Sequence, residues 1–281
     1  MRRAVIDIGT NTVKLLVADV DGERVTVLIN EDTTTRLGEG LTRSGHLNPH
    51  AIRRTLDAVE HYRQLAAQHG AERIRVLATC AAREAANDSD LVLAVKDRCG
   101  LVVEVIGGEM EAELIWRGVH SDPKFRDVRG PVLDVGGGSS ELILPPYRIS
   151  LPLGAVRLTE QYGEDVATLT QHIRQQLAHH AAPFQAVEGV AVGTGGSVVT
   201  LARLEYTEVH GAMLTASQVR ALVMKLHAIP LPQRRTYPRL PPERADIIVA
   251  GGLIVLLMME AVGAHRLLVS TRNLRFGALW D

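Results

Sequence analysis

Two short runs of small residues each follow an aspartate at the end of an apolar segment. Asp7 precedes residues 9–12, and Asp134 precedes residues 136–139. Small side chains leave backbone N–H groups open to phosphate oxygens, and neighbouring hydroxyls add further donors. We therefore interpret both runs as phosphate-binding turns, with the contact residues Thr10, Asn11, Thr12, Gly136, Gly137, Gly138 and Ser139.

The two turns belong to an internal repeat. VIDIGTNTVKLLVAD, which starts at Val5, aligns without gaps with VLDVGGGSSELIL, which starts at Val132. A single glycine turn is more typical of a plain hairpin, and a single strand-end aspartate often caps a turn, but duplication of the pair favours a function. The repeat predicts two related domains, residues 1–118 and 119–281, whose turns face each other across a cleft.

The two aspartates suit a metal ion, and a third run of small residues suits an anion. Asp7 and Asp134 are well placed to hold hydrated Mg²⁺ against substrate phosphates, because that ion keeps waters and takes few protein carboxylates. Gly195, Gly196 and Ser197 follow an apolar stretch and precede a helical pattern. Free N–H groups and the dipole at a helix N-terminus favour phosphate, so these residues are predicted to bind substrate.

The elements around these runs alternate between strand and helix patterns. Residues 4–20 read as strand, turn and strand, and residues 48–68 form an amphipathic helix that begins at Asn48-Pro49. Residues 73–79 and 102–106 read as strands, separated by a helix over residues 91–98. This alternation predicts the α/β class, with the glycine runs at the ends of strands.

Composition excludes several classes of protein. The chain of 281 residues is 46% hydrophobic and 22% charged, which argues against disorder. A net charge of -1 gives no general attraction to a polyanion, so binding of phosphate must come from local arrangement, and no nucleic-acid partner is expected. The longest apolar run, residues 247–259, is too short to span a membrane and reads as a buried helix. Two cysteines and a start without a signal-peptide pattern predict a reduced, cytoplasmic setting.

An ordered set of motifs along nearly the whole chain resembles the exopolyphosphatase and guanosine pentaphosphate phosphohydrolase family (Ppx/GppA). The motifs are DIGTNTVKLLVAD, RLGEGL, ATCAAREA, IGGEMEAEL, LDVGGGSSEL, LPLGAVRLTE, GTGGSVVTLA, ERADIIVAGG and NLRFGAL. The resemblance implies a duplicated actin-like, or ribonuclease H-like, ATPase fold with two domains flanking a cleft. The chain is similar to the short two-domain form of the family.

The resemblance also assigns roles to single residues. Glu111, the glutamate before Ala112 in IGGEMEAEL, matches the family's base, which would orient and deprotonate the attacking water. Glu141 matches a second functional carboxylate, which would position metal or water. Arg83 matches an arginine that clamps phosphate. Lys14 occupies the place of Glu141 in the first repeat and suits neutralisation of a terminal phosphate.

The implied reaction is attack of water on a terminal phosphoryl group, assisted by Mg²⁺ or Mn²⁺. The substrate is inorganic polyphosphate or, alternatively, guanosine pentaphosphate. Only 4% of residues are aromatic, and none forms a recognisable base-stacking pattern. A sugar or acetate kinase and a non-catalytic polyphosphate-binding sensor or filament protein are the alternatives of other classes. Stimulation by K⁺ and a homodimer remain open.

A basic stretch in the second half suggests how a long polyanion is held. Residues 209–242 contain no Asp or Glu, and they contain Arg220, Lys225, Arg234, Arg235 and Arg239. We interpret these five side chains as a basic strip that follows the phosphate chain, against the alternative of a solvated loop without a ligand.

Overall fold

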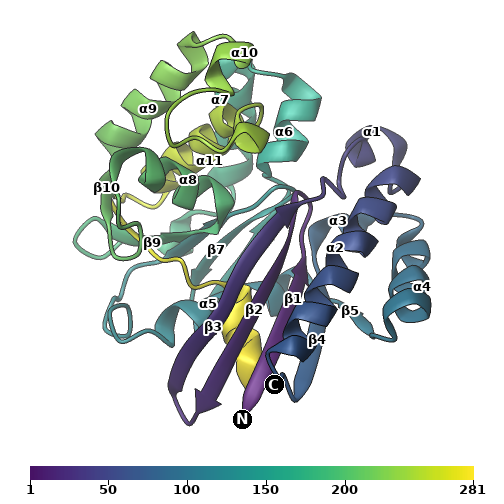
Figure 1. Cartoon of the computed structure of the whole chain (residues 1–281). Coiled ribbons are helices and arrows are strands. Elements are labelled where there is room, and N and C mark those ends of the chain that lie inside the picture. The colour runs from purple at the N-terminus through teal and green to yellow at the C-terminus, as the bar shows by residue number, and fades with distance from the viewer. The chain divides into compact units, whose positions relative to one another are not determined.

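The computed structural model describes all of residues 1–281 and divides the chain into two compact units (Figure 1). The first unit comprises Met1–Ser121 and Leu274–Asp281, and the second comprises Asp122–Asn273. The chain first passes from one unit to the other after Ser121, near the boundary predicted at residues 118 and 119. The C-terminal segment differs from the prediction, because it packs in the first unit rather than in the second.

The first unit is built on a sheet with the strand order β3-β2-β1-β4-β5. Strands β1, β2 and β3 form an antiparallel meander, and β4 and β5 extend the sheet parallel to β1. The strands are β1 (Arg2–Ile8), β2 (Thr12–Asp21), β3 (Arg24–Thr34), β4 (Arg73–Ala78) and β5 (Val103–Val105). The helices are α1 (Leu41–Ser44), α2 (Pro49–Gln68), α3 (Cys80–Glu84), α4 (Asp88–Cys99), α5 (Gly108–His120) and α12 (Leu274–Gly277).

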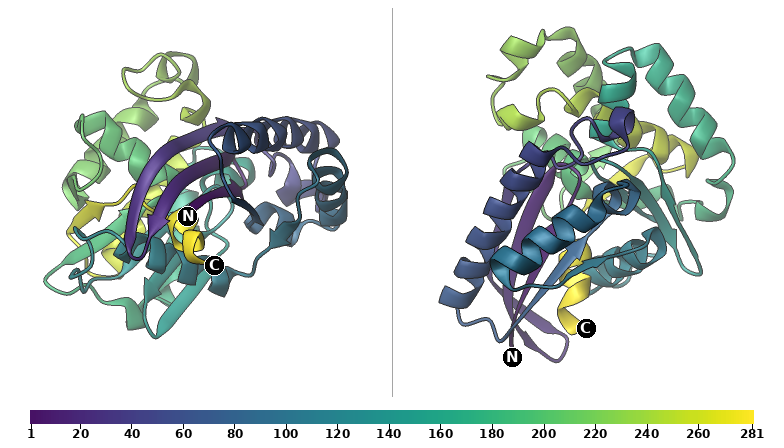
Figure 2. Two further views of the ribbon diagram at one scale, coloured as in Figure 1. Left: turned by 60° about the horizontal axis from the view of Figure 1, so that its bottom comes forward. Right: turned by 90° about the vertical axis from the view of Figure 1, so that its right-hand side faces the viewer.

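The long helix of this unit follows its sequence signals. Helix α2 begins at Pro49, and the side chain of the preceding Asn48 accepts a hydrogen bond from the His50 amide. It ends just before Gly70, which adopts a positive φ. Val59 and Tyr62 on its buried face pack with alternate residues of strands β1 and β2. Figure 2 shows the curvature of these strands. The opposite face of these strands meets α12, which packs on α5.

The second unit has a sheet with the order β10-β11-β9-β6-β7-β8. Its strands are β6 (Val132–Val135), β7 (Ser140–Leu144), β8 (Tyr147–Leu151), β9 (Val190–Thr194), β10 (Met213–Thr215) and β11 (Arg266–Val269). Its helices are α6 (Ala155–Tyr162), α7 (Val166–Ala178), α8 (Gly195–Glu205), α9 (Ala216–Ala228), α10 (Leu231–Arg234) and α11 (Ile248–Ala261). Helix α11 is buried along nearly all its length, which confirms the interpretation of residues 247–259 as a core helix.

The internal repeat is visible as a repeated topology. Strands β6, β7 and β8 form an antiparallel meander, and β9 and β11 extend the sheet parallel to β6. The order β8-β7-β6-β9-β11 in the second unit therefore corresponds to β3-β2-β1-β4-β5 in the first. The predicted α/β class is confirmed, and both glycine turns lie where the central strand meets its antiparallel neighbour.

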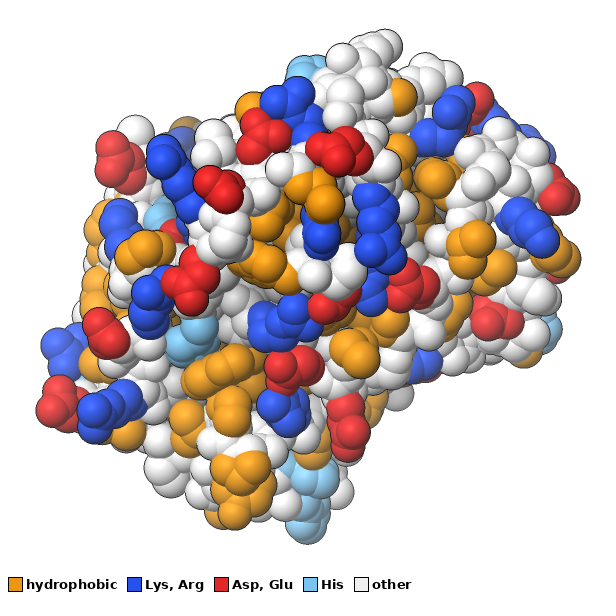
Figure 3. Space-filling model, turned by 90° about the horizontal axis from the view of Figure 1, so that it is seen from below, with side chains coloured by type: hydrophobic (Ala, Val, Ile, Leu, Met, Phe, Trp, Pro, Cys, Tyr) orange, Lys and Arg blue, Asp and Glu red, His pale blue; other side chains and the backbone are white.

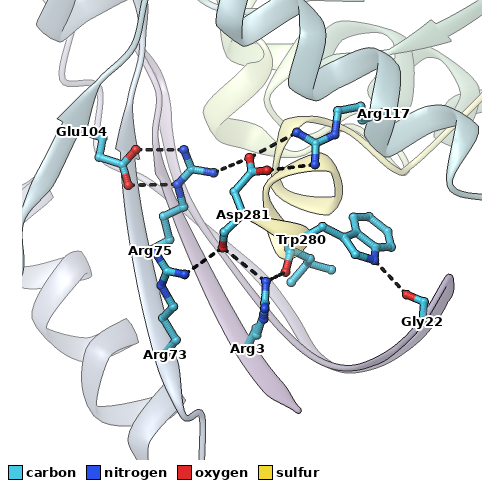
Figure 4. Close-up of polar contacts among 9 residues, drawn as sticks. Arg3, Gly22, Arg73, Arg75, Glu104, Arg117, Trp280 and Asp281 are labelled. Atoms are coloured by element: carbon cyan, nitrogen blue, oxygen red, sulfur yellow. Dashed lines mark hydrogen bonds and ion pairs between the residues drawn. The ribbon is translucent and has the colours of Figure 1, made fainter.

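The C-terminal segment is held in the first unit by packing and by ionic contacts. A Cβ atom at Gly277 would overlap the Leu114 carbonyl oxygen, so α12 lies directly against the backbone of α5. Beyond it, the Asp281 carboxylate meets Arg75 at 2.8 Å and Arg117 at 2.9 Å (Figure 4). Arg3 and Arg73 donate to the Asp281 backbone oxygen. These partners come from β1, β4 and α5, and only tertiary structure brings them together.

Charges of both signs are mixed over the face of the molecule shown in Figure 3, in keeping with the net charge of -1. No helix combines the length and the apolar character that crossing a membrane requires.

Candidate functional site

In the first unit, three loops leave the carboxyl ends of three adjacent parallel strands. The turn of residues 9–12 follows β1, helix α3 with Arg83 follows β4, and helix α5 with Glu111 follows β5. Backbone hydrogen bonds tie the loops to one another, from Thr79 N to Ile8 O and from Ile106 N to Ala78 O. This edge of a parallel sheet is where α/β proteins place ligands.

The first glycine turn is narrow and well braced. The Gly9 amide donates to the Thr12 carbonyl at 3.1 Å, and the Gly38 amide donates to the Thr10 carbonyl at 2.8 Å. A side chain at Gly38 would overlap the Thr10 methyl group, so only glycine permits this approach. The Asn11 Oδ1 atom is buried and has no hydrogen-bond partner, which marks a polar atom able to receive a donor from outside the chain.

Asp7 lies at the end of β1 beside two cations. It pairs across the sheet with Lys14, whose Nζ is 4.0 Å from the Asp7 carboxylate. Burial raises the pKa of the Asp7 carboxyl, and the charges of Lys14 and Arg275 act in the opposite direction. Arg275 comes from α12, is buried, and donates to the Leu15 carbonyl and the Asn30 side chain. The predicted Asp7 and Lys14 are thus brought together, and Arg275 is an addition that their sequence spacing did not reveal.

Glu111 and Arg83 form an ion pair at the same edge. Glu111 lies in the first turn of α5, is 8% exposed, and accepts from Arg83 Nη1 at 3.1 Å. The same Arg83 nitrogen donates to the Ile106 carbonyl at 2.8 Å, which fixes the guanidinium over the loop. Glu109, two positions earlier, is exposed. The structure therefore separates a buried, oriented glutamate from a solvated one in this acidic segment.

In the second unit, two buried carboxylates face each other across neighbouring strands. Asp134 on β6 and Glu141 on β7 are directly paired in the sheet register. Glu141 accepts a hydrogen bond from the Ser150 hydroxyl at 2.7 Å. The Asp134 carboxylate lies against the Cα atom of Gly195, which has a positive φ and no room for a Cβ. Two adjacent buried carboxylates repel each other unless a cation or a proton lies between them.

The second glycine turn repeats the geometry of the first. The Gly136 amide donates to the Ser139 carbonyl at 3.0 Å. The start of α6 is pressed against this turn, because a Cβ at Gly154 would overlap the backbone of Gly137 and Gly138. Gly195, Gly196 and Ser197 form the first turn of α8, so their position at a helix N-terminus is confirmed. The anion that they were predicted to bind stays a prediction.

Two arginines of the second unit that sequence reasoning did not single out border these glycine turns. Arg157 on α6 donates to the Gly138 carbonyl at 2.8 Å. The Arg244 guanidinium lies over Gly196, where an added Cβ would overlap it. The sequence feature that could have indicated these two arginines is their position within the motifs LPLGAVRLTE and ERADIIVAGG. Both side chains are half-buried.

The basic strip proposed from residues 209–242 is wrong for Arg234, and it stays a prediction for the other four side chains, which are exposed. Arg234 is 1% exposed and forms an ion pair with Glu164. Its guanidinium also donates hydrogen bonds to the Ile229 and Ala245 carbonyls, so it is not available to a ligand. Arg220 pairs with Glu260, and Lys225 lies over the Tyr237 ring. The stretch itself lacks acidic residues, but its acidic partners Glu164 and Glu260 come from other segments, which the local sequence cannot show.

A metal ion would find few protein ligands here. No group of three or more His, Cys, Asp or Glu side chains is arranged to hold one. The paired carboxylates Asp134 and Glu141 fit an ion that completes its shell with water and substrate oxygens, as Mg²⁺ does. Asp7, with a lysine opposite it, offers a single carboxylate.

Comparison with known proteins identifies the family of this chain. A sequence model described as the Ppx/GppA phosphatase family matches residues 16–281. The chain belongs to the Ppx/GppA phosphatase family. Exopolyphosphatase 2 of Mycobacterium tuberculosis is 31% identical over 310 aligned residues, which cover 98% of this chain and 97% of that protein. Exopolyphosphatase 1 of Mycobacterium bovis is 29% identical, covering 99% of this chain and 87% of that protein.

Solved structures of this family share the fold. The crystal structure of the Aquifex aeolicus Ppx/GppA member has a TM-score of 0.81 at 31% identity and covers 99% of this chain and 96% of that one. An exopolyphosphatase from Cytophaga hutchinsonii has a TM-score of 0.91 at 26% identity, with 100% and 97% covered. The duplicated actin-like α/β fold is thus established for this Ppx/GppA chain, and the predicted family is confirmed.

Proposed function

We propose that this Ppx/GppA phosphatase is an exopolyphosphatase that transfers the terminal phosphoryl group of inorganic polyphosphate to water. The observation that carries the proposal is the buried Glu111, which Arg83 holds at the loop edge of the first sheet. A carboxylate fixed in this way can orient a water molecule and accept its proton as the phosphoryl group departs. The curated relatives described above bear the name exopolyphosphatase, which supports the substrate.

The other side chains divide the work of binding. We assign Lys14, Arg157 and Arg244 to the substrate phosphates, together with amides of the two glycine turns and of α8. A guanidinium beside exposed backbone amides suits phosphate oxygens, because both present N–H donors to an anion. Four polar residues of the turns are buried: Thr10, Asn11, Thr12 and Ser139. They contribute to the shape of the turns and also provide hydrogen-bond donors.

Asp134 and Glu141 of the second unit would hold Mg²⁺ or Mn²⁺, and the metal-binding role predicted for Asp7 of the first unit stays a separate prediction. Bound there, the ion would polarise phosphate oxygens and offset their charge. Glu141 keeps its orientation through the Ser150 hydroxyl. A divalent ion beside these two carboxylates would be attracted by the negative charge of each.

The decisive experiment is phosphate release from polyphosphates of defined length, with guanosine pentaphosphate measured in parallel. Release from polyphosphate with no sugar, acetate or nucleoside diphosphate present identifies water as the acceptor and excludes a kinase. If phosphate is released faster from guanosine pentaphosphate at equal concentration, guanosine pentaphosphate rather than polyphosphate is the preferred substrate. Binding of polyphosphate without release would instead favour a sensor.

A further inference from the structure

One polar cluster of the second unit has no part in the proposed hydrolysis. It joins Asp122, at the start of this unit, to His210 and to Thr271 near its end. The His210 Nε2 atom is 3.1 Å from Asp122 Oδ2, and the His210 Nδ1 atom is 3.0 Å from the Thr271 hydroxyl. Hydroxyl, imidazole and carboxylate thus form a continuous hydrogen-bonded chain, an arrangement that activates hydroxyl nucleophiles.

The direction of these hydrogen bonds follows from a backbone contact. The Thr271 amide lies 3.2 Å from His210 Nδ1 and can only donate, so Nδ1 carries a lone pair. The Nε2 atom then bears the proton and donates it to Asp122, and the Thr271 hydroxyl can donate to Nδ1. Burial lowers the pKa of His210, with the charge of Asp122 opposing this and those of Lys124 and Arg272 adding to it. A neutral imidazole is the form that can receive a proton.

The carboxylate end of the cluster is fixed. Asp122 Oδ2 also meets Arg272 Nε at 3.0 Å, and Asp122 Oδ1 accepts from the Lys124 amide at 2.9 Å. The Phe125 ring packs edge-on against the His210 ring, with the centroids 5.2 Å apart. Imidazole and carboxylate are therefore held in one orientation, whereas Thr271 itself is half-buried and reachable from solvent.

The position of Thr271 in the sheet places it beside the candidate phosphate loop. Strand β11 runs parallel to β9 with Val269 opposite Gly193, and the Ser270 amide donates to the Gly193 carbonyl. The loop after β11 therefore leaves the sheet alongside the N-terminus of α8. The Thr194 hydroxyl, which precedes Gly195, donates to the Arg272 carbonyl at 3.1 Å and ties the two loops together.

The repeated topology adds an independent argument. Strand β11 occupies in the second sheet the place that β5 occupies in the first. The loop after β5 leads to Glu111, the proposed base, and the loop after β11 carries Thr271 with its histidine and aspartate. The loop after β5 thus carries a proton acceptor, whereas the loop after β11 carries a hydroxyl whose histidine and aspartate come from the loops before β10 and β6.

We propose that Thr271 is a site of self-phosphorylation, with His210 as its proton acceptor and Asp122 as the residue that positions His210. The inference rests on the proposed function, because polyphosphate is the donor. The bond between the terminal phosphorus and its bridging oxygen breaks, and a bond from phosphorus to Thr271 Oγ1 forms. The hydroxyl proton moves to His210 Nδ1, and the shortened polyphosphate leaves with the bridging electron pair.

The test is incubation of the full chain with Mg²⁺ and polyphosphate, followed by mass spectrometry of its peptides. The expected result is one added phosphoryl group on Thr271, retained in Thr271→Ser and lost in Thr271→Val. His210→Gln keeps a side chain able to reach Asp122 but removes the proton acceptor, so labelling should fall about ten-fold or more. Thr207→Val, at an exposed threonine of the same unit, is the matched control and should label normally.

Phosphate release, measured in the same reactions, separates this inference from the proposed function. Release should stay within about two-fold of wild type in Thr271→Val and His210→Gln, because neither residue belongs to the proposed hydrolytic site. Release without a label on Thr271 overturns the self-phosphorylation alone, and equal labelling in His210→Gln overturns the role of His210 as the proton acceptor. Absence of both release and label overturns both proposals. Thermal unfolding of each variant shows whether a loss of label reflects a loss of fold.

Discussion

The two glycine turns share one backbone and differ in charge. In each, a glycine amide closes the turn onto a carbonyl three residues ahead, at 3.1 Å for Gly9 and 3.0 Å for Gly136. Opposite the aspartate, the first turn carries Lys14 and the second carries Glu141. The first turn is therefore balanced toward an anion, and the second toward a cation. Duplication thus produced the same turn geometry twice. The residue opposite the aspartate, Lys14 in one turn and Glu141 in the other, gives the two turns different charge preferences.

The loops after the outer parallel strands extend this contrast. After β5 the first unit presents Glu111 in an ion pair, and after β11 the second presents a hydroxyl bonded to a neutral histidine. Equivalent places in a repeated fold can therefore carry different chemistry, because a loop is less constrained by packing than the strands that it joins.

The largest effect should come from the first unit. Glu111→Gln preserves shape and keeps a partner for Arg83, but its amide cannot accept a proton from water. We expect phosphate release to fall on the order of 10²-fold or more with little change in polyphosphate binding. Glu109→Gln, two positions away and exposed, is the control and should remain close to wild type. Near-normal turnover in Glu111→Gln would show that Glu111 is not the catalytic base.

The next effect tests the cation preference of the second turn. Asp134→Asn and Glu141→Gln should each raise the Mg²⁺ concentration for half-maximal activity by on the order of ten-fold, because each removes one of two paired charges. Asp7→Asn should raise it less, since Lys14 already faces that carboxylate. Chelation and dialysis should abolish activity, and Mg²⁺ or Mn²⁺ should restore it. Equal shifts in all three variants would contradict the division between the turns.

A smaller effect should follow from the lysine of the first turn. Lys14→Met keeps the aliphatic stem and removes the charge that faces substrate phosphate. We expect KM for polyphosphate to rise several-fold with kcat nearly unchanged, about 1 kcal/mol of binding. The measurement is steady-state kinetics at two salt concentrations, because a lost phosphate contact should weaken the salt dependence. A fall in kcat at constant KM would instead place Lys14 in the transition state.

The smallest effect concerns the residues once interpreted as a basic strip. Arg235 is exposed, and Arg239 donates to the Tyr206 carbonyl. Arg235→Gln with Arg239→Gln should change KM by less than about two-fold for long and for short polyphosphate alike. Arg234 is left out because removal of a buried partner of Glu164 would destabilise the unit rather than test binding. Selective weakening for long chains would support the predicted strip.

Much of the site was predictable from the residues. Asp7, Asp134 and the two glycine turns could be found because strand ends and small residues leave local signals, and the repeat supplied a second copy. Glu111 was separated from Glu109 by its motif. Arg157, Arg244 and Arg275 were not found, because their positions over Gly138, over Gly196 and beside Leu15 depend on segments distant in sequence.

The sequence by itself determined the strands, the turns at their ends and the family, because backbone preference and hydrophobic period are local properties. Only the tertiary structure decided which charged side chains pair with one another. It paired Arg234 with Glu164, returned Leu274–Asp281 to the first unit, and joined Asp122 to His210 and Thr271. The reason is physical: whether a side chain binds a ligand or a neighbour depends on what the fold brings within a few ångströms of it.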